Sequence, residues 1–369
     1  MSGKDVGVVV STQKGAVILR SDENRDLWDA GDRFLPEEDV NKVIIDSNHK
    51  MYAATLSEGV FTSDDSGRTW KQSSRGLNVR KVWSLAEDAH ESGVIFAGTQ
   101  YGHLFRSDNS GGNWTEVVGL HNAPGRNEWG VDWGFGTTGL TIHTIISDPE
   151  KRDRLFLIAS GKGIYRSDDG GETWVVLKDG LKEKCPVSGS NMAPGIPDGD
   201  RESKIREHLE GVHSCSHKIV ISPRNHATLY QQNHCGVYVS SDSGNTWTDI
   251  SPGNHLRHGF PVDAVRDNVF VIPSGQGLCE RHNSCIQGQL SVYTTADSGK
   301  HWKREIEGLP GNVHTAVLRD SFSHDTLDVP GVYFGTTTGE VYCSTDLGQN
   351  WRLAASGLGR IQGISAMVS

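Results

Sequence analysis

The sequence has no cluster of basic residues and no long hydrophobic run. Its 36 lysines and arginines are outnumbered by 46 aspartates and glutamates, which gives a net charge of −10. Such a chain offers little to nucleic-acid phosphates or to an anionic membrane surface, so neither partner is expected. No segment is long and apolar enough to cross a bilayer as a helix, and residues 1–10 lack the basic and apolar regions of a signal peptide. We therefore predict a cytoplasmic protein that does not insert into membranes.

Cysteines at zinc-finger spacing are also absent. The six cysteines form no Cys-x-x-Cys pair, and a reducing compartment would leave them as thiols. Cys279 and Cys285 share one predicted loop, so these two could form a disulfide if the protein were exported.

Methionine is scarce and glycine is abundant, with 4 and 44 residues respectively. This balance favours many short strands joined by tight turns over a helical fold. A length of 369 residues is large for one ordinary domain but suits a barrel, a solenoid or a propeller. We predict an all-β protein.

One eight-residue pattern, Ser/Thr-x-Asp-x-Gly-x-x-Trp, recurs along the chain. Five copies keep all four defining residues, a sixth has Asn109 in place of the aspartate, and a seventh near the N-terminus lacks the glycine. In such a turn the aspartate would cap backbone amides, the glycine would take a conformation that other residues resist, and the tryptophan would pack between neighbouring sheets. We therefore expect the motif to be structural. The copies are Ser21–Trp28, Ser63–Trp70, Ser107–Trp114, Ser167–Trp174, Ser240–Trp247, Thr295–Trp302 and Ser344–Trp351.

The spacing of the motif matches one blade of a β-propeller. Trp70 follows Trp28 by 42 residues and precedes Trp114 by 44, and a four-stranded blade takes about 40 to 50 residues. Residues 360–369 read as a first strand without a blade, and residues 6–11 as a second strand without a first. The sequence predicts one domain over residues 1–369, a seven-bladed β-propeller whose N- and C-terminal strands share one blade and close the ring.

The motif and its spacing make the chain resemble the Asp-box (BNR-repeat) propellers, and the resemblance covers nearly the whole sequence. This group includes sialidases, sortilin-type receptor domains and photosystem assembly factors. The resemblance implies the propeller fold, but it says little about function because one fold serves many activities. A sialidase would carry an N-terminal motif of the Arg-Ile-Pro kind, which this sequence lacks, so sialidase activity is not expected.

Histidine is concentrated at one position of the repeat. When the units are aligned on the motif, the first strand of each unit directs one residue toward the channel. Four of these seven residues are histidine, although the chain holds only 16 histidines in 369 residues. First strands line the axis of a propeller, so the four imidazoles are expected to converge there. The aligned residues are Asn41, Trp83, His143, His217, His258, His314 and Gly363.

Four converging imidazoles predict a metal centre with His143, His217, His258 and His314 as its ligands. An all-nitrogen site with open positions suits a divalent transition metal, iron first and zinc or copper as alternatives. In geometry, such a centre is similar to the four-histidine iron site of the carotenoid-cleavage oxygenases, which are also seven-bladed propellers. Two metal-free interpretations stay open: a polar channel filled with water, and a site for an anionic ligand.

Three insertions interrupt the repeat, at residues 119–140, 183–212 and 273–289. From their places between strands, all three are predicted to lie on the face opposite the motif turns, above the histidines. Long structured loops on a rigid scaffold often carry binding sites. We therefore expect the substrate to bind on this face.

The first insertion combines carboxylates with aromatic rings. Glu128 and Asp132 are the predicted catalytic carboxylates. Aromatic rings beside carboxylates suit a sugar or an aromatic substrate, although the insertion's two tryptophans are equally consistent with anchors that hold the loop to the rim. The predicted substrate contacts are Arg126, Trp129 and Trp133 in this insertion, with Asn41, Trp83 and His234.

These features favour a metal-dependent enzyme that acts on a small molecule. Non-haem iron oxygen chemistry would follow if the ion is iron, and hydrolysis or lyase chemistry through a bound water if it is zinc. One alternative is a glycoside hydrolase, lyase or sugar-binding propeller of sialidase-like type that uses Glu128 and Asp132. Two carboxylates four residues apart on one loop are, however, poorly placed to flank a glycosidic bond. The other alternative is a propeller without enzymatic activity that grips a protein partner.

Overall fold

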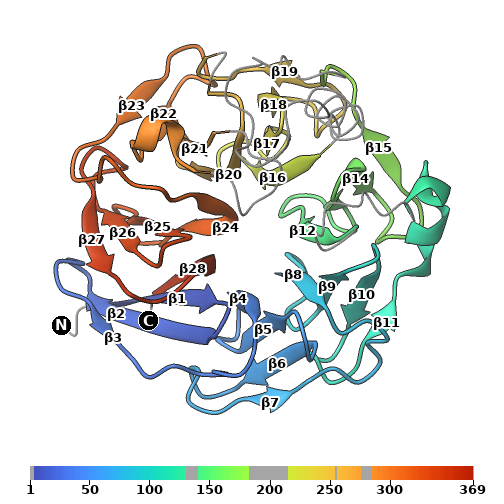
Figure 1. Ribbon diagram of the computed structural model, residues 1–369. Coiled ribbons are helices and arrows are strands. Elements are labelled where there is room, and N and C mark those ends of the chain that lie inside the picture. Colours follow the sequence, from blue (N-terminus) through green and yellow to red (C-terminus); the bar gives the residue numbers. More distant parts are fainter. Residues whose placement is uncertain (1–3, 130–139, 183–214, 254–255, 276–283, 369) are drawn as a thin grey trace, which may run out of the picture.

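The chain folds into small antiparallel sheets arranged as a ring. The structure is a computed structural model that describes residues 4–129, 140–182, 215–253, 256–275 and 284–368. Its strands form five four-stranded sheets and one eight-stranded sheet, which surround a central axis (Figure 1). The fold is therefore all-β and propeller-like, as the repeat predicted. Within these ranges, no helix has the length and apolar character needed to span a membrane.

Each four-stranded sheet is an antiparallel meander. Its first strand lies nearest the axis and its last strand lies at the rim (Figure 1). The four-stranded sheets contain β4 (Val40–Ile45), β5 (Met51–Thr55), β6 (Val60–Ser63) and β7 (Lys71–Gln72); β8 (Val82–Glu87), β9 (Ile95–Thr99), β10 (Leu104–Ser107) and β11 (Thr115–Glu116); β12 (Ile142–Ser147), β13 (Leu155–Ala159), β14 (Gly163–Ser167) and β15 (Val175–Leu177); β16 (Ser216–Ile221), β17 (Leu229–Asn233), β18 (Gly236–Ser240) and β19 (Thr248–Asp249); and β20 (Gly259–Val265), β21 (Asn268–Pro273), β22 (Val292–Thr295) and β23 (Lys303–Glu305).

The eight-stranded sheet contains the first and the last strand of the chain. β28 (Ile361–Val368) pairs antiparallel with β1 (Asp5–Thr12) along its length. It meets β24 (Val317–His324) at a single parallel pair, Asp320 with Gly363. The first and last strands therefore share one sheet, which the sequence predicted. In spatial order this sheet runs β27 (Arg352–Ala355), β26 (Val341–Ser344), β25 (Val332–Thr336), β24 (Val317–His324), β28 (Ile361–Val368), β1 (Asp5–Thr12), β2 (Gly15–Asp22) and β3 (Asp29–Ala30).

The repeated motif forms the turn between the third and fourth strands of a sheet. In the Ser63–Trp70 copy, the Asp65 carboxylate accepts hydrogen bonds from the Thr69 amide at 2.9 Å and the Thr69 hydroxyl at 2.7 Å. The Ser63 hydroxyl accepts the Gly67 amide at 3.0 Å. Gly67 has a φ of +86°, which is strained for a residue with a Cβ. The turns that begin at Ser167, Ser240, Thr295 and Ser344 repeat the two amide bonds.

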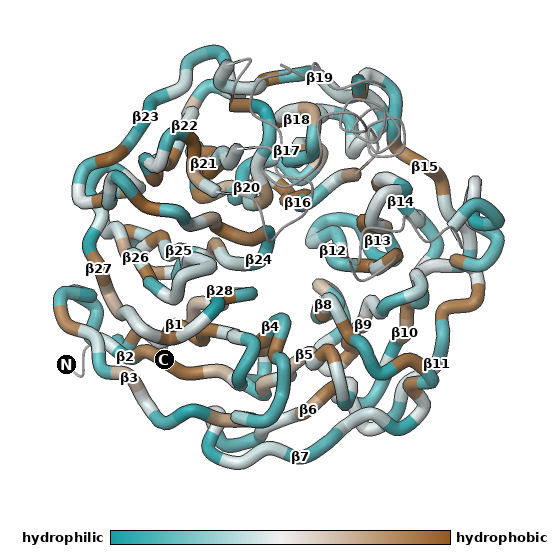
Figure 2. The backbone as a smooth tube through the Cα atoms, viewed as in Figure 1, coloured by the Kyte–Doolittle hydropathy of each residue, from teal (hydrophilic) through white to brown (hydrophobic). Residues whose placement is uncertain are grey.

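The hydrophobic core lies between neighbouring sheets, where the motif tryptophans pack. Trp114, Trp174, Trp247 and Trp351 are buried in these layers. The Trp114 indole donates to the carbonyl of Ser73 in the preceding sheet at 2.7 Å, so the side chain connects two sheets. Figure 2 shows the hydrophobic residues concentrated on the strands and hydrophilic residues on many of the connections.

The cysteines depart in part from the prediction of free thiols. Cys285 and Cys343 are free thiols, whereas Cys235 is disulfide-bonded. Because Cys285 is a free thiol, the pairing of Cys279 with Cys285 that the sequence left open is not formed.

Protonation of the motif aspartates is expected to weaken their turns. Hydrogen bonds from Thr69 and Ser63 lower the pKa of Asp65 to about 2, below the roughly 3.9 of an unfolded chain. The stability that Asp65 contributes is therefore complete above about pH 4 and is lost as the pH falls through about 2. We expect the thermal midpoint of an Asp65→Asn/Asp242→Asn variant, followed by circular dichroism, to depend less on pH in this window than that of the wild type.

The chain supplies a natural control for this change. In the sixth copy of the motif, Asn109 Oδ1 accepts the Asn113 amide at 3.0 Å, so a neutral amide supports the same turn and the variant should fold. Equal pH dependence in variant and wild type would show that these carboxylates do not contribute to acid stability.

Candidate functional site

A repeated backbone hydrogen bond shows which residues at the channel are equivalent. In the sheet of β4–β7, for example, the Leu56 amide after the second strand donates to the carbonyl of Asp39 before the first strand. The corresponding bond occurs around the ring, and we term the residues whose carbonyls accept it the mouth residues. They are Asp39, Lys81, Thr141, Cys215, His258, Ala316 and Arg360.

The residues two positions after the mouth residues form a second equivalent set. In four sheets this position is a β-bulge at the start of the first strand. Counted from the mouth residues, the set is Asn41, Trp83, His143, His217, Phe260, Leu318 and Gln362.

The predicted equivalence of His258 and His314 with His143 and His217 is therefore wrong. His258 is itself a mouth residue, and His314 lies two residues before the mouth residue Ala316 and is exposed. In β24 the pairing is irregular over a longer stretch, from Val317 to Phe322, than at the bulges of β4, β8, β12 and β16. Such an irregularity changes the number of residues between the motif and the position at the channel, and the motif sequence does not reveal it.

Three histidines and one cysteine nevertheless meet at the channel. The ring centroids of His217 and His234 are 4.6 Å apart, those of His234 and His258 4.9 Å, and those of His217 and His258 5.5 Å. The ligand atoms of Cys215, His217 and His234 lie within 4.8 Å of one another. We term Cys215, His217, His234 and His258 the Cys–His cluster.

Two neighbouring sheets position this cluster. Cys215 and His217 stand on either side of Ser216, the first residue of β16, and His258 directly precedes β20. His234 lies in the turn from β17 to β18, and its amide donates to the Cys215 carbonyl at 3.4 Å. All four residues are therefore held at the ends of strands, where the backbone is fixed by pairing.

Side-chain hydrogen bonds stiffen the turn that carries His234. The Asn233 side-chain oxygen accepts the amides of Cys235 at 2.7 Å and Gly236 at 2.9 Å. The buried Gln232 amide donates to the Arg257 carbonyl at 2.7 Å, next to His258. This last bond ties the turn to the neighbouring sheet.

Burial keeps two imidazoles of the cluster neutral. Desolvation lowers the pKa of His217 well below its usual value, and the neighbouring His234 and His258 lower it further. Desolvation also lowers the pKa of His258 to about 4. Both side chains are therefore uncharged at neutral pH.

His143 belongs to a different environment. It is buried, and its Nε2 has no hydrogen-bond partner among the described residues. Burial and the nearby Arg319 lower its pKa well below the usual value. Lys218 and Asp320 also act on it electrostatically, so His143 lies near the ionic group of the channel.

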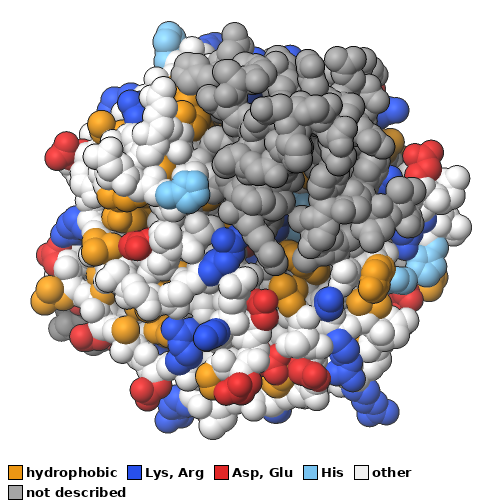
Figure 3. Space-filling model, viewed as in Figure 1, with side chains coloured by type: hydrophobic (Ala, Val, Ile, Leu, Met, Phe, Trp, Pro, Cys, Tyr) orange, Lys and Arg blue, Asp and Glu red, His pale blue; other side chains and the backbone are white. Residues whose placement is uncertain are grey.

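That ionic group is a buried carboxylate held between two lysines. Asp320 Oδ1 lies 2.5 Å from the Lys218 ammonium and 3.3 Å from that of Lys42. Burial favours the neutral acid, but the two ammonium groups outweigh it and hold the pKa of Asp320 below its usual range. Burial lowers the pKa of Lys42, opposed by Asp320. The carboxylate and the two ammonium groups thus stabilise one another in their charged forms. Figure 3 shows charged side chains of both signs around the middle of the face viewed there.

The mouth residue Asp39 carries a carboxyl group that sequence reasoning missed. It is half-buried, and burial raises its pKa against the opposing effects of a 2.5 Å hydrogen bond from Gln362 and the charge of Arg360. A carboxyl group with a raised pKa at the entrance of a channel is suited to donate a proton. Nothing in the repeat pattern distinguishes this aspartate, because its environment comes from both ends of the chain.

The described part of the first insertion lies at the outer rim. The short helices η1 (Val118–Asn122) and η2 (Arg126–Glu128) are at the outside of the ring (Figure 1). Trp129 is buried, packs on Tyr165 at 5.2 Å between ring centroids and donates to its hydroxyl at 3.2 Å. Arg126 stacks on the Trp129 ring at 4.4 Å. Trp129 thus anchors the loop, and this buried ring is not open to a substrate.

The remaining predicted residues are dispersed. Glu128 is exposed at the rim, and Asp132 and Trp133 lie outside the described residues. Trp83 is buried at the channel, and its carbonyl accepts the Asn41 side chain at 2.5 Å, so these two residues contact each other across neighbouring sheets.

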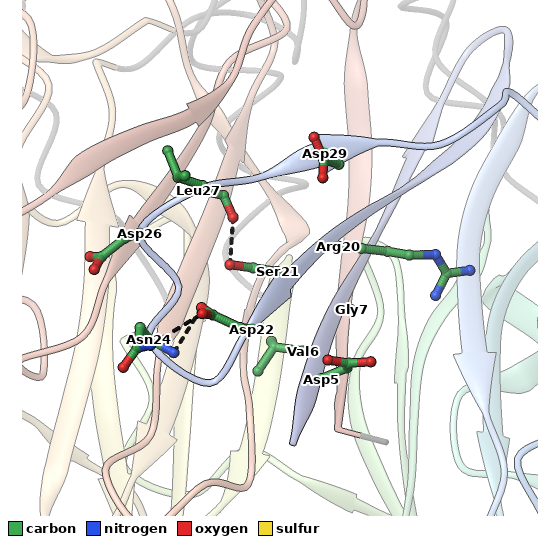
Figure 4. A pocket seen from close by; sticks show the side chains of 10 residues that line it. All are labelled: Asp5, Val6, Gly7, Arg20, Ser21, Asp22, Asn24, Asp26, Leu27 and Asp29. Carbon is green, nitrogen blue, oxygen red and sulfur yellow. Dashed lines mark hydrogen bonds between the residues drawn. The ribbon is translucent and has the colours of Figure 1, made fainter. Parts of the chain in front are cut away.

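Two other groups of polar residues lie away from the axis. One is a surface pocket of about 500 Å³ beside β1–β3, lined by Asp5, Asp22 and Asp29 among others (Figure 4). In it the Asp22 carboxylate already caps the Asn24 amide at 3.0 Å. The other group lies next to β10 and β11, where a single Glu116 oxygen contacts His103 at 2.5 Å and His121 at 2.8 Å.

Comparison with curated proteins points to xyloglucanases. No family model matches the chain. A xyloglucanase of a Paenibacillus species is 24% identical over 315 residues, which cover 78% of this chain and 27% of that enzyme. An oligoxyloglucan-reducing end-specific xyloglucanase of Emericella nidulans is 22% identical over 337 residues, covering 79% of this chain and 39% of that enzyme. The chain thus spans less than half the length of these relatives.

Comparison with solved structures supports the propeller-like fold. An ancestral GH74 enzyme aligns with a TM-score of 0.57 at 18% identity and covers 89% of this chain and 38% of its own. A YCF48 protein bound to a D1 peptide aligns with a TM-score of 0.51 at 12% identity and covers 85% of this chain and 82% of its own. At these identities the likeness concerns the fold alone.

Removal of the Asp320 charge is expected to destabilise the protein strongly. An Asp320→Asn variant leaves two largely buried ammonium groups without a counter-charge, and breaking such a pair costs about 3–5 kcal/mol. The free energy of unfolding in urea measures the loss. The matched control is Asp64→Asn, because Asp64 also bridges two lysines, Lys50 and Lys71, but is exposed. That change should cost no more than about 1 kcal/mol, and equal losses in the two variants would contradict the buried ionic group.

Trp129 is expected to contribute to stability. A Trp129→Ala variant loses a buried indole and should lower the free energy of unfolding by about 3–5 kcal/mol. An Arg126→Ala variant removes only the stacked guanidinium and should cost about 1 kcal/mol. Unchanged stability of the Trp129→Ala variant, measured by urea unfolding, would restore Trp129 as a candidate substrate platform.

Proposed function

We propose that this chain is a carbohydrate-active propeller of the glycoside hydrolase class. The observation that carries the proposal is its alignment with xyloglucanases over more than three quarters of its length. The substrate class that this favours is xyloglucan or an oligosaccharide derived from it. Of the functions considered from the sequence, the glycoside hydrolase alternative is the one that the comparisons favour.

The proposed architecture is a seven-bladed propeller. The eight-stranded sheet divides naturally at the single parallel pair between β24 and β28. Counting its halves as two blades and each four-stranded sheet as one gives the seven units that the repeated motif predicts.

Asp39 is our proposed proton donor for the hydrolysis. Glycoside hydrolysis needs a carboxylic acid that protonates the leaving oxygen and a second carboxylate across the scissile bond. Asp39 fits the first role because it lies at the channel mouth and burial raises its pKa. Glu128 lies exposed at the outer rim, away from Asp39, so it does not fill the second role beside Asp39.

The proposal predicts release of reducing sugar from xyloglucan or its oligosaccharides. An Asp39→Asn variant keeps the shape of the side chain but lacks the proton, so its kcat should fall about 10²–10⁴-fold, with glycan binding retained by isothermal calorimetry. The control is Asp29→Asn, which removes an exposed carboxylate at the rim and should leave the rate unchanged.

Two results would count against this function. A wild-type protein that neither binds nor cleaves xyloglucan or other β-glucans would overturn it and favour the predicted protein-binding propeller. A wild-type activity that survives Asp39→Asn but is lost in Glu128→Gln would keep the function and move the proton donor to the rim.

A further inference from the structure

We propose that the Cys–His cluster binds one zinc-class metal ion and thereby clamps two neighbouring sheets at the mouth of the channel. Three ligands are the Cys215 sulfur and one ring nitrogen each from His217 and His234, whose ligand atoms lie within 4.8 Å of one another. The proposed fourth is His258, whose ring centroid is 4.9 Å from that of His234. This site shares two histidines with the centre predicted from the sequence, but it replaces His143 and His314 with Cys215 and His234.

The spacing of the rings fits a shared ion. Zinc–nitrogen bonds of about 2.0–2.1 Å at tetrahedral angles place the centroids of two bound imidazoles about 5 Å apart. The three observed separations are 4.6, 4.9 and 5.5 Å, which bracket this value. Cys215 completes the set, because its sulfur lies within 4.8 Å of the ligand nitrogens of His217 and His234.

Hydrogen bonds orient two of the rings as metal ligands. The His217 Nδ1 lies 2.5 Å from the Gly259 carbonyl oxygen, which only accepts, so Nδ1 carries the proton and the lone pair is on Nε2. The His258 Nδ1 lies 3.1 Å from the Ser274 hydroxyl. A second hydrogen-bond partner on the opposite ring nitrogen is the usual feature that fixes the tautomer of a metal-bound histidine.

An ion would also satisfy a polar atom that the protein leaves alone. His258 is 3% exposed, and its Nε2 has no hydrogen-bond partner among the described residues. Buried polar nitrogens rarely stay unpaired.

The ligand set indicates the kind of ion and its role. One thiolate with three imidazoles and no carboxylate suits zinc or copper(I) better than iron. Four protein ligands leave no open position, which is typical of a structural site. Three ligands come from the sheet of β16–β19 and one from the end of β20–β23, so the ion would join the two sheets where their first strands begin.

Cobalt(II) is the probe for this site, because it absorbs visible light when bound tetrahedrally and shows a thiolate charge-transfer band. We expect chelator-treated wild-type protein to take up one equivalent of Co²⁺ with both features, and Zn²⁺ to displace it and raise the melting temperature. The isosteric Cys215→Ser variant should lose the charge-transfer band. The His234→Ala variant should bind at least about 100-fold more weakly, since even outer-shell changes cost 10–100-fold.

The matched control is His314→Ala, which removes an exposed imidazole that sequence reasoning placed in the centre. It should titrate like the wild type. A wild-type protein that shows no thiolate band with Co²⁺ and no stabilisation by Zn²⁺ or Cu⁺ would overturn the site. A band that persists in Cys215→Ser would overturn the ligand assignment.

The wild-type titration is decisive even if a variant fails to fold. The measurement uses no sugar, so its outcome is independent of the glycoside hydrolase proposal. Metal binding without glycan cleavage, or cleavage without metal binding, would leave one proposal standing and remove the other.

Discussion

The structure depends on the pairing of β28 with β1. A ring of sheets leaves no sheet face uncovered only when the ring closes, because each sheet buries its faces against its two neighbours. Here closure is achieved by the last strand of the chain adding to the first along seven residue pairs. Buried residues from both termini then share one hydrophobic cluster, with Val8 and Val10 near Ile361 and Ile364. Closure also brings Gln362 and Arg360 to Asp39, so the environment of that carboxyl group is a consequence of the ring.

In a closed ring, residues at the same position of successive repeats come together at the axis. The mouth residues come from distant parts of the chain, yet one repeated backbone hydrogen bond sets each of them at the start of a first strand. Residues that differ in type at this position therefore form a composite surface that no single repeat contains. The acidic Asp39, the basic Lys81 and the pair of Cys215 and His258 show how one structural position can serve separate chemical roles around the ring.

The sequence predicts the fold more completely than it predicts the site. The motif turn is local, since Asp65 bonds with residues at most four positions away, and eight residues are enough to recognise it. Prediction of the site depends on the number of residues between the motif and the position that faces the channel. That number is as predicted for Asn41, Trp83, His143 and His217, but in β20, β24 and β28 the equivalent residues are Phe260, Leu318 and Gln362 instead of the predicted ones.

Cys215 was not predicted from the sequence and the role of Trp129 was left open, for two different physical reasons. Cys215 has no second cysteine at metal-site spacing, and the rings of His234 and His258 that lie beside His217 come from distant positions in the sequence. Trp129 was ambiguous because an aromatic ring on a loop looks the same in sequence whether it faces a substrate or the core. The contacts of the Trp129 ring with Tyr165 show that it faces the core.

Two groups of buried polar side chains lie at the channel, and they differ in charge. The ionic group balances Asp320 against Lys42 and Lys218, so its groups keep their charges. In the Cys–His cluster, His217 and His258 are neutral instead, and the Arg319 charge reinforces this at His217. The residue that follows His217 is Lys218, so adjacent positions of one strand enter different groups. Strand alternation sends successive side chains to opposite sides, and the β-bulge between Ser216 and Lys218 locally changes that alternation. His217 is the extra residue at this bulge, and Lys218 resumes the regular pairing with Gln232.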